Sequence, residues 1–228
     1  MPVFQLNKTL LFPPPQLAGT DGLLAVGGDL SVPRLLLAYQ QGIFPWYGED
    51  DPILWWSPDP RLVLFPPEFR CSRRLARTLR QGRFTVTFDT AFPEVMARCA
   101  HTRTSRGEKT WISPEMFHAY CALHELGYAH AVESWLDGEL VGGLYGVSMG
   151  RVFFGESMFS TVADSSKVAL AALVDRLLAW QFDCIDCQVA TSHLSSLGAR
   201  EISREEFLGR LAVSCEASGR LGSWSEMP

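Results

Sequence analysis

The sequence predicts an α+β protein, with a small irregular domain over residues 1–62 and a larger domain over residues 63–228. The first observation is a series of runs rich in Val, Ile and Phe with tight turns between them, which is typical of an antiparallel meander. These runs are residues 128–136, 139–148 and 152–160. The second observation is a helical pattern over residues 165–181 that leads into one more strand-like run at 184–189. A helix between two strands makes them parallel neighbours, so we expect the last two runs to pair.

Strands that are antiparallel first and are then joined through one helical crossover indicate an acetyltransferase-like architecture. Adjacent strands of such folds splay apart and admit an acyl donor, although architecture alone does not determine the reaction. Helix caps and periodicity predict the remaining elements of the larger domain. They are a strand at 61–65, a helix capped by Ser72, a strand at 84–88, a helix at 92–100, a helix from the Ser113 cap to Leu126, and a final helix opened by a Ser203 and Glu206 capping box.

The first 62 residues are interrupted by many prolines and aromatic residues, so regular elements must be short there. One helix is expected, with Ser31 as its cap, Pro33 in its first turn and Gly42 at its end. We interpret this part of the chain as an irregular domain packed by aromatic side chains.

Composition is that of an ordinary globular protein, with 47% hydrophobic and 20% charged residues among 228 and a formal net charge of −5. No apolar run approaches the roughly 18 residues of a membrane span, and the N-terminus lacks the pattern of a signal peptide. We therefore expect a cytoplasmic protein that uses neither a membrane nor a metal. The six cysteines look reduced, and the Cys184 and Cys187 pair lacks the second pair that a zinc site needs.

A cluster of arginines stands out against the acidic total. Six of them fall within residues 70–83 with no acidic residue among them: Arg70, Arg73, Arg74, Arg77, Arg80 and Arg83. Their helical spacing forms one stripe. A charged stripe is usually only solvated, but solvated faces normally mix signs, so binding of a polyanion stays open beside the simpler interpretation.

Polar residues also interrupt apolar strand patterns near the end of the meander. The strand period of two places Asp186 and Gln188 on one face, and Ile185 and Cys187 on the other. Glu156 lies among large apolar residues in the neighbouring strand. Buried strands rarely keep such residues for stability, so we expect a polar site where the two strands end.

The sequence lacks the complete motifs of other enzyme classes. Ser157 lacks the second glycine of a nucleophile elbow, and no motif places a histidine to activate it. His193 is more readily explained as a structural histidine than as a catalytic one. From the pattern alone, Phe153, Met158 and Ile185 are more commonly explained as core residues of apolar strands than as site residues.

Many long blocks, in one order along nearly the whole chain, resemble the bacterial leucyl/phenylalanyl-tRNA–protein transferase family. They are Gly22–Ser31, Gly42–Trp46, Pro52–Arg61, Thr110–Ile112, Leu140–Gly146, Gly155–Ser160, Ser166–Lys167, Ile185–Gln188 and Ser196–Ala199. The resemblance implies a family-specific N-terminal domain, a GNAT-like catalytic domain and no cofactor. It also implies transfer of Leu, Phe or, less well, Met from aminoacyl-tRNA to proteins that begin with Arg or Lys, which marks them for the N-degron route of degradation.

The resemblance also assigns residues. Asp186 and Gln188 match the catalytic pair, and Glu156 matches an acidic residue near the acceptor. The aminoacyl pocket and the terminal adenosine account for the other substrate-binding positions, namely Trp111, Phe153, Met158, Leu144, Ile185, Ser157 and Trp46. The arginines expected to hold tRNA are Arg73, Arg74, Arg77, Arg80 and Arg83. Departures are mild: Leu144, Leu173 and Leu177 stand where some relatives carry Met or Phe, and Thr191 where some carry Asn.

The residues suit this chemistry, because an aminoacyl ester is already activated and an N-terminal amine with a pKa of about 7.7–8.0 is partly neutral near pH 7. We expect the Gln188 oxygen to accept a hydrogen bond from the attacking amine, with Asp186 increasing the negative character of that oxygen. Two other functions stay open: an acetyl-coenzyme-A-dependent acetyltransferase, which lacks its pyrophosphate loop here, and a non-catalytic RNA-binding module, which leaves the polar residues unexplained.

Overall fold

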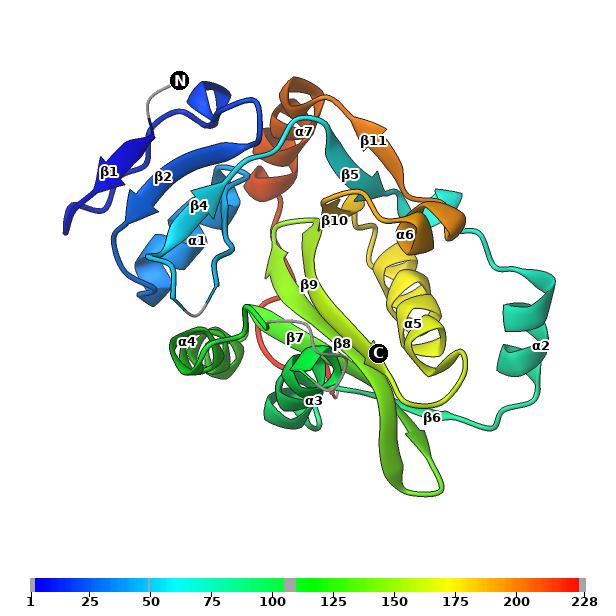
Figure 1. Ribbon diagram of the computed structural model, residues 1–228. Helices are drawn as coiled ribbons and strands as arrows, with labels where there is room; N and C mark the ends of the chain where they lie inside the picture. Colours follow the sequence, from blue (N-terminus) through cyan, green and yellow to red (C-terminus); the bar gives the residue numbers. More distant parts are fainter. Residues whose placement is uncertain (1–2, 49, 105–109, 226–228) are drawn as a thin grey trace.

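The computed structural model describes residues 3–48, 50–104 and 110–225, and these form two β-sheets with helices packed around them (Figure 1). A four-stranded sheet in the order β1-β2-β4-β3 contains β1 (Phe4–Leu6), β2 (Leu23–Gly27), β3 (Phe44–Pro45) and β4 (Leu54–Trp56). A seven-stranded sheet in the order β11-β5-β10-β9-β8-β7-β6 contains β5 (Arg61–Leu64), β6 (Thr85–Phe88), β7 (Ala129–Leu136), β8 (Glu139–Met149), β9 (Val152–Ser160), β10 (Cys184–Gln188) and β11 (Arg200–Ile202).

The strands of the N-terminal sheet are short, as the many prolines require, but the sequence patterns did not indicate that they form a sheet. Helix α1 (Val32–Gln40) follows the second strand and begins where expected. Ser31 occupies its N-cap position, yet its side chain makes no capping hydrogen bond. Gly42 adopts a φ of +70° just after the helix, a conformation that its missing Cβ makes easy.

Helices cover both faces of the larger sheet. Helices α3 (Phe92–Thr104) and α4 (Pro114–Glu125) lie on one side of it, and α5 (Ser165–Ala179) lies on the other (Figure 1). The other helices are α2 (Arg73–Arg80), α6 (Ser192–Ser196), α7 (Arg204–Glu216), η1 (Pro15–Leu17) and η2 (Pro66–Glu68). None of the helices in the described ranges is both long and apolar enough to cross a bilayer.

Three of the expected helix caps are present. Ser72, Ser113 and Ser203 each accept a hydrogen bond from the backbone N–H three residues on, at 3.1–3.2 Å. Capping of this kind satisfies a backbone donor that has no partner within the helix. The sequence patterns therefore located α2, α4 and α7 correctly, whereas they missed α6 and β11.

The meander and the crossover are both confirmed. Strands β7, β8 and β9 pair antiparallel in chain order, and α5 carries the chain to β10, which pairs parallel with β9. This parallel pairing covers Cys184, Ile185 and Asp186 opposite Val152, Phe153 and Phe154, and then stops. The two strands separate beyond that point, as expected for a GNAT-like domain, and the α+β class is confirmed.

Candidate active site

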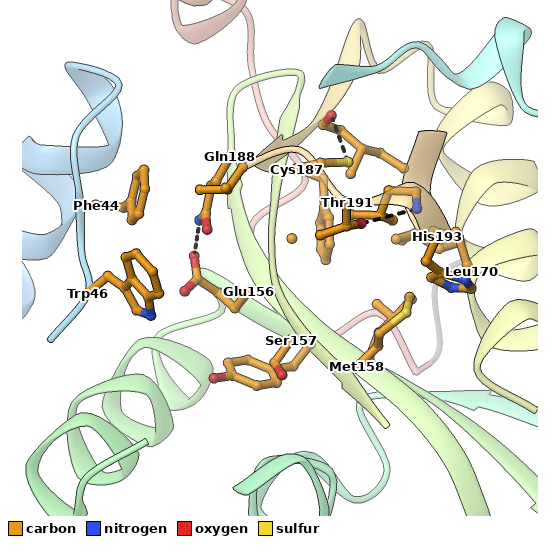
Figure 2. A pocket seen from close by; sticks show the side chains of 18 of the residues that line it. Phe44, Trp46, Glu156, Ser157, Met158, Leu170, Cys187, Gln188, Thr191 and His193 are labelled. Atoms are coloured by element: carbon orange, nitrogen blue, oxygen red, sulfur yellow. Dashed lines mark hydrogen bonds between the residues drawn. The ribbon is translucent and has the colours of Figure 1, made fainter. Parts of the chain in front are cut away.

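A cavity of about 560 Å³ opens where β9 and β10 separate (Figure 2). Apart from Asp186, every side chain expected to be catalytic or substrate-binding lines it. The lining residues are Phe44, Pro45, Trp46, Trp111, Leu144, Tyr145, Phe153, Gly155, Glu156, Ser157, Met158, Leu170, Leu173, Ile185, Cys187, Gln188, Val189, Thr191, His193 and Leu194. Most of these side chains are apolar, so the cavity suits an apolar group next to a small number of polar atoms.

A β-bulge places Glu156 in the cavity wall. Tyr145 pairs with Ser157 and the next residue of β8, Gly146, pairs with Gly155, so Glu156 is the extra residue of β9. Regular alternation along β9 would place neighbouring side chains on opposite faces, but at the bulge Gly155, Glu156, Ser157 and Met158 all line the cavity. Bulges next to functional sites redirect side chains in this way.

The Glu156 carboxylate accepts three hydrogen bonds from side chains of separate elements. Tyr39 of α1 donates to Oε1 at 2.8 Å, Tyr120 of α4 donates to Oε2 at 3.1 Å, and Gln188 Nε2 donates to Oε1 at 3.0 Å. Burial raises the pKa of Glu156 to about 7, against the tyrosine hydrogen bonds, which lower it. Burial and the nearby carboxylate also raise the pKa of both tyrosines well above 10, so both remain donors.

Gln188 reaches the cavity through a second bulge. Asp186 pairs with Val63 of β5 and Gln188 with the adjacent Leu62, which makes Cys187 the extra residue. Gln188 itself has a φ of +64°, in the left-handed region that non-glycine residues rarely enter. The expectation that Ile185 and Cys187 face away from Gln188 is thus wrong, since all three line the cavity. Figure 2 shows the amide of Gln188 directed at Glu156.

Asp186 is fully buried behind this wall and does not line the cavity. Its carboxylate accepts two hydrogen bonds from Arg61, with Nε at 2.8 Å from Oδ1 and Nη2 at 2.6 Å from Oδ2. Oδ1 also accepts from the backbone N–H of Gln188 at 2.9 Å. The expected face shared by Asp186 and Gln188 is therefore wrong: Asp186 contacts the Gln188 backbone.

Aromatic side chains of the N-terminal sheet close one end of the cavity. Phe44 and Trp46 come from the segment that begins at β3, and Figure 2 shows them across from Glu156 and Gln188. Trp46 is 44% exposed and lies edge-on against Trp56, with ring centres 5.8 Å apart. An exposed, supported indole at the rim provides a flat apolar surface for a ring-shaped group.

His193 and Thr191 lie at the α6 side of the cavity. Burial and the nearby Lys167 lower the pKa of His193, so this imidazole is neutral near pH 7. The Thr191 hydroxyl accepts from the Leu194 backbone N–H at 3.2 Å and caps α6. This contact gives Thr191 a local structural task.

Outside the cavity, the arginines of residues 70–83 are all exposed. Tertiary structure nevertheless supplies an acidic partner that the local sequence lacks. Asp164, which precedes α5, pairs with Arg74 at 3.0 Å and with Lys167 at 3.5 Å. Arg73, Arg77 and Arg80 surround a shallow depression beside Cys71.

Local sequence signals missed several residues of the site. Tyr39 and Tyr120 belong to helices far apart in the chain, and their apolar helical periodicity marks them only as buried positions. Arg61 opens an apolar strand, where a fully buried arginine is uncommon. This unusual placement was the one available signal.

An apolar cavity that ends at an amide and a carboxylate, between diverging strands of an α+β domain, suits an enzyme that transfers acyl groups. Comparisons with known proteins specify the family. The family model described as "Leucyl/phenylalanyl-tRNA protein transferase" matches residues 63–212, and the model of that family's N-terminal domain matches residues 28–59. The chain belongs to the leucyl/phenylalanyl-tRNA protein transferase family.

Curated relatives of the same description match over almost their full length. The protein from Syntrophobacter fumaroxidans is 65% identical over 224 residues, which cover 98% of this chain and 96% of the relative. The protein from Desulfatibacillum aliphaticivorans is 59% identical over 225 residues, which cover 99% of this chain and 97% of the relative.

Solved structures match less closely. The structure of L-PGS from Bacillus licheniformis has a TM-score of 0.41 at 10% identity and covers 74% of this chain and 54% of that chain. An aminoglycoside acetyltransferase from an uncultured soil metagenomic sample has a TM-score of 0.39 at 11% identity, with coverage of 60% and 89%. Scores this low carry no conclusion about this chain.

Proposed function

We propose that this protein transfers a leucyl, phenylalanyl or, less well, methionyl group from aminoacyl-tRNA to the α-amine of a protein whose first residue is Arg or Lys. The observation that carries the proposal is the cavity, which has an apolar end and, at its other end, the hydrogen-bonded pair of Glu156 and Gln188. Family membership supports the same reaction.

The apolar end suits the side chain of the donor amino acid. Phe153, Leu144 and Ile185 are buried there, and Met158 completes the wall. The exposed ring of Trp46 is available to stack on the terminal adenosine of the tRNA. A donor bound across these two contacts has its ester carbonyl near Gln188.

Gln188 is placed to position the attacking amine. Its Nε2 donates to Glu156, so its Oε1 remains as the acceptor for an N–H of the amine. The amine nitrogen forms a bond to the ester carbon and loses a proton, the ester C–O bond breaks, and the 3′-terminal hydroxyl of the tRNA leaves with a proton. The ester is already reactive, so positioning supplies most of the acceleration.

Glu156 is the acidic group that we assign to the acceptor. A first residue with both an ammonium and a side-chain cation favours the ionised form of a neighbouring carboxylate. Glu156 also holds the Gln188 amide, so occupation of the acceptor site and orientation of Gln188 depend on the same carboxylate.

Exposed Arg73, Arg74, Arg77, Arg80 and Arg83 would bind tRNA phosphates without reading sequence, and Arg74 must then share its charge with Asp164. We further propose two domains, divided just before β5 (Arg61–Leu64) because this strand belongs to the seven-stranded sheet, and no metal or cofactor in the reaction. The modified proteins would be cytoplasmic substrates of the N-degron route.

One assay tests the proposal. Purified protein receives labelled leucine on tRNA with a peptide that begins with Arg, and the product is separated from free leucine. Acetyl-coenzyme A with the same peptide tests acetyl transfer, and a peptide that begins with Ala tests the need for a basic first residue. Transfer of leucine to the Arg peptide alone is expected, whereas acetylation, or tRNA binding without transfer, would overturn the proposal.

A further inference from the structure

Arg61 is a buried charge that the reaction outlined above does not use. It opens β5, is fully buried, and forms its two hydrogen bonds with Asp186 at 2.6 and 2.8 Å. Buried ion pairs of this kind contribute little net stability, because the cost of removing two charges from water is about as large as the energy of their attraction. A role in geometry explains the pair better.

The guanidinium also contacts two aromatic rings from other parts of the chain. Its central carbon lies 4.8 Å from the ring centre of Phe44 and 4.7 Å from that of Phe207. Phe44 belongs to β3 of the N-terminal sheet and lines the cavity, and Phe207 belongs to α7. Arg61 therefore joins three separate elements at one point: the N-terminal sheet, α7 and β10.

Asp186, which Arg61 holds in place, in turn contacts the backbone of Gln188. Its Oδ1 holds the Gln188 backbone N–H at 2.9 Å, at the residue whose φ is +64°. A non-glycine residue in the left-handed region costs about 1–2 kcal/mol relative to its ordinary conformations. A local hydrogen bond that an aspartate accepts from the backbone N–H two residues on stabilises such a turn. Without it, the Gln188 side chain would lose the orientation that directs it at Glu156.

We propose that Arg61 is a positioning residue for the transfer reaction: by orienting Asp186 it holds the Gln188 backbone in the conformation that presents the side-chain amide to the attacking amine. This inference rests on the proposed function. Arg61 and Asp186 do not line the cavity, so neither contacts the donor or the acceptor. Asp186 then acts through the backbone of Gln188 and not on its side-chain oxygen.

The test compares Arg61→Lys and Arg61→Met with the parent protein. Lysine keeps the charge and supports folding, but it cannot form the two parallel hydrogen bonds of a guanidinium. We expect kcat to fall about tenfold for Arg61→Lys and about a hundredfold for Arg61→Met, because an error of about 1 Å in a reacting geometry costs on the order of a hundredfold. KM for leucyl-tRNA and for the peptide should change less than about twofold.

Arg151→Met is the matched control. Arg151 also pairs with an aspartate next to β10, Asp183 at 3.1 Å, but this pair lies before the first residue of the strand and is partly exposed. Its loss should leave kcat unchanged. A fall in kcat equal to that of Arg61→Met would mean that any loosening of β10 impairs the reaction, and would overturn the specific role of Arg61.

A double-mutant cycle separates positioning from general damage. In a Gln188→Ala background, Arg61→Lys should lower kcat no further, because its effect passes through the Gln188 side chain. Losses that multiply, or a normal kcat in both Arg61 variants, would overturn the proposal.

A second readout does not depend on activity. The Gln188 backbone amide should exchange its hydrogen faster in both Arg61 variants than in the parent, whereas Arg151→Met should leave it protected. Unchanged protection in the Arg61 variants overturns the proposal. If the parent protein transfers no leucine, the proposed function fails, and the exchange measurement still decides whether Arg61 holds Gln188.

Discussion

Two glutamates on either side of β8, the fully buried Glu133 on β7 and the partly buried Glu156 on β9, differ in what surrounds them. Burial raises the pKa of both carboxyl groups. Glu133 accepts hydrogen bonds from the hydroxyls of Thr87 and Thr90 and from the backbone N–H groups of Thr90 and Ala91. Glu156 accepts only from side chains, and it lines the cavity.

The difference shows that burial and a raised pKa do not by themselves mark a reactive carboxylate. Glu133 secures the turn between β6 and α3, because its partners are Thr87 of β6 and Thr90 and Ala91 of that turn. Glu156 is displaced into the cavity by a bulge, and one of its partners, Gln188, is itself a candidate for the chemistry. Access to a cavity and the nature of the donors separate a structural acid from a functional one.

Removal of Glu133 should have the largest effect on stability. Glu133→Ala removes the buried acceptor of Thr87, Thr90 and Ala91. The donors at Thr87 and Ala91 are partly buried, and each donor left unsatisfied costs about 1–3 kcal/mol. We expect the free energy of unfolding to fall by about 3–5 kcal/mol and Tm by roughly 6–15 °C, measured by thermal denaturation. Transfer activity per folded molecule should stay within about twofold. Lost activity at unchanged Tm would reverse the assignment of the two glutamates.

Glu156→Gln should mainly lower activity, whereas Glu133→Ala mainly lowers stability. Loss of a charge-assisted contact of about 1.5–3 kcal/mol should lower kcat/KM for an Arg-initiated peptide roughly ten- to a hundredfold, mainly through a higher KM. Binding of leucyl-tRNA should not change. Steady-state kinetics with each substrate varied in turn will measure this, and exposed Glu139→Gln removes the same charge as a control. Normal use of the peptide, or impaired binding of the donor, would contradict the role given to Glu156.

The pH dependence of stability should distinguish parent and Glu156→Gln proteins. The folded pKa of Glu156, about 7, lies above its ordinary value of 4.5, so the protonated form is favoured in the folded protein. Its contribution to stability is therefore complete below pH 4.5 and is lost as pH rises through about 7. Relative to the variant, the parent should lose about 2–3 kcal/mol between pH 4.5 and 8, measured by urea unfolding. A difference that stays constant with pH would show that folding does not shift the pKa of Glu156.

The apolar end of the cavity, at the opposite end from Glu156, gives a prediction about the donor. Phe153, Met158 and Leu144 line this end, and we expect them to leave little room beside a Cβ atom, so side chains branched there, such as Val and Ile, should react poorly. One methyl group is worth about 1–3 kcal/mol in such a pocket, which predicts a ratio of tens to hundreds between leucine and isoleucine. Competing the two aminoacyl-tRNAs will measure it, and equal rates would contradict the proposed location of the side chain.

The smallest effect is expected far from both glutamates, on the exposed arginines. Arg77→Ala or Arg80→Ala should weaken binding of every aminoacyl-tRNA alike and reduce the dependence of log K on log salt by about 0.7–0.9 for each lost phosphate contact. Tm and acceptor KM should not change. Exposed Arg98→Ala on α3 is the matched control. Unaltered salt dependence in both variants would leave the stripe as a solvated face.

Local patterns in the sequence determined much of this protein. Strand alternation, helix periodicity and the caps at Ser72, Ser113 and Ser203 located most elements of the larger sheet, because these signals depend on residues within a few positions of one another. The crossover between β9 and β10 followed from the same reasoning. Polar residues within apolar strand patterns indicated Glu156 and Gln188 as candidates, and resemblance over long blocks identified the family and matched these residues to roles.

Only the tertiary structure decided how these residues meet. The bulges at Glu156 and Cys187 depend on the register of neighbouring strands, which no local pattern specifies, and they overturned the simple alternation on both strands. Tyr39 and Tyr120 reach Glu156 from separate helices. Arg61 binds Asp186, 125 positions further along the chain, at a buried position outside the cavity. Contacts between residues so distant in the chain arise from packing of whole elements, and they decide which polar group faces the substrate and which one supports it from behind.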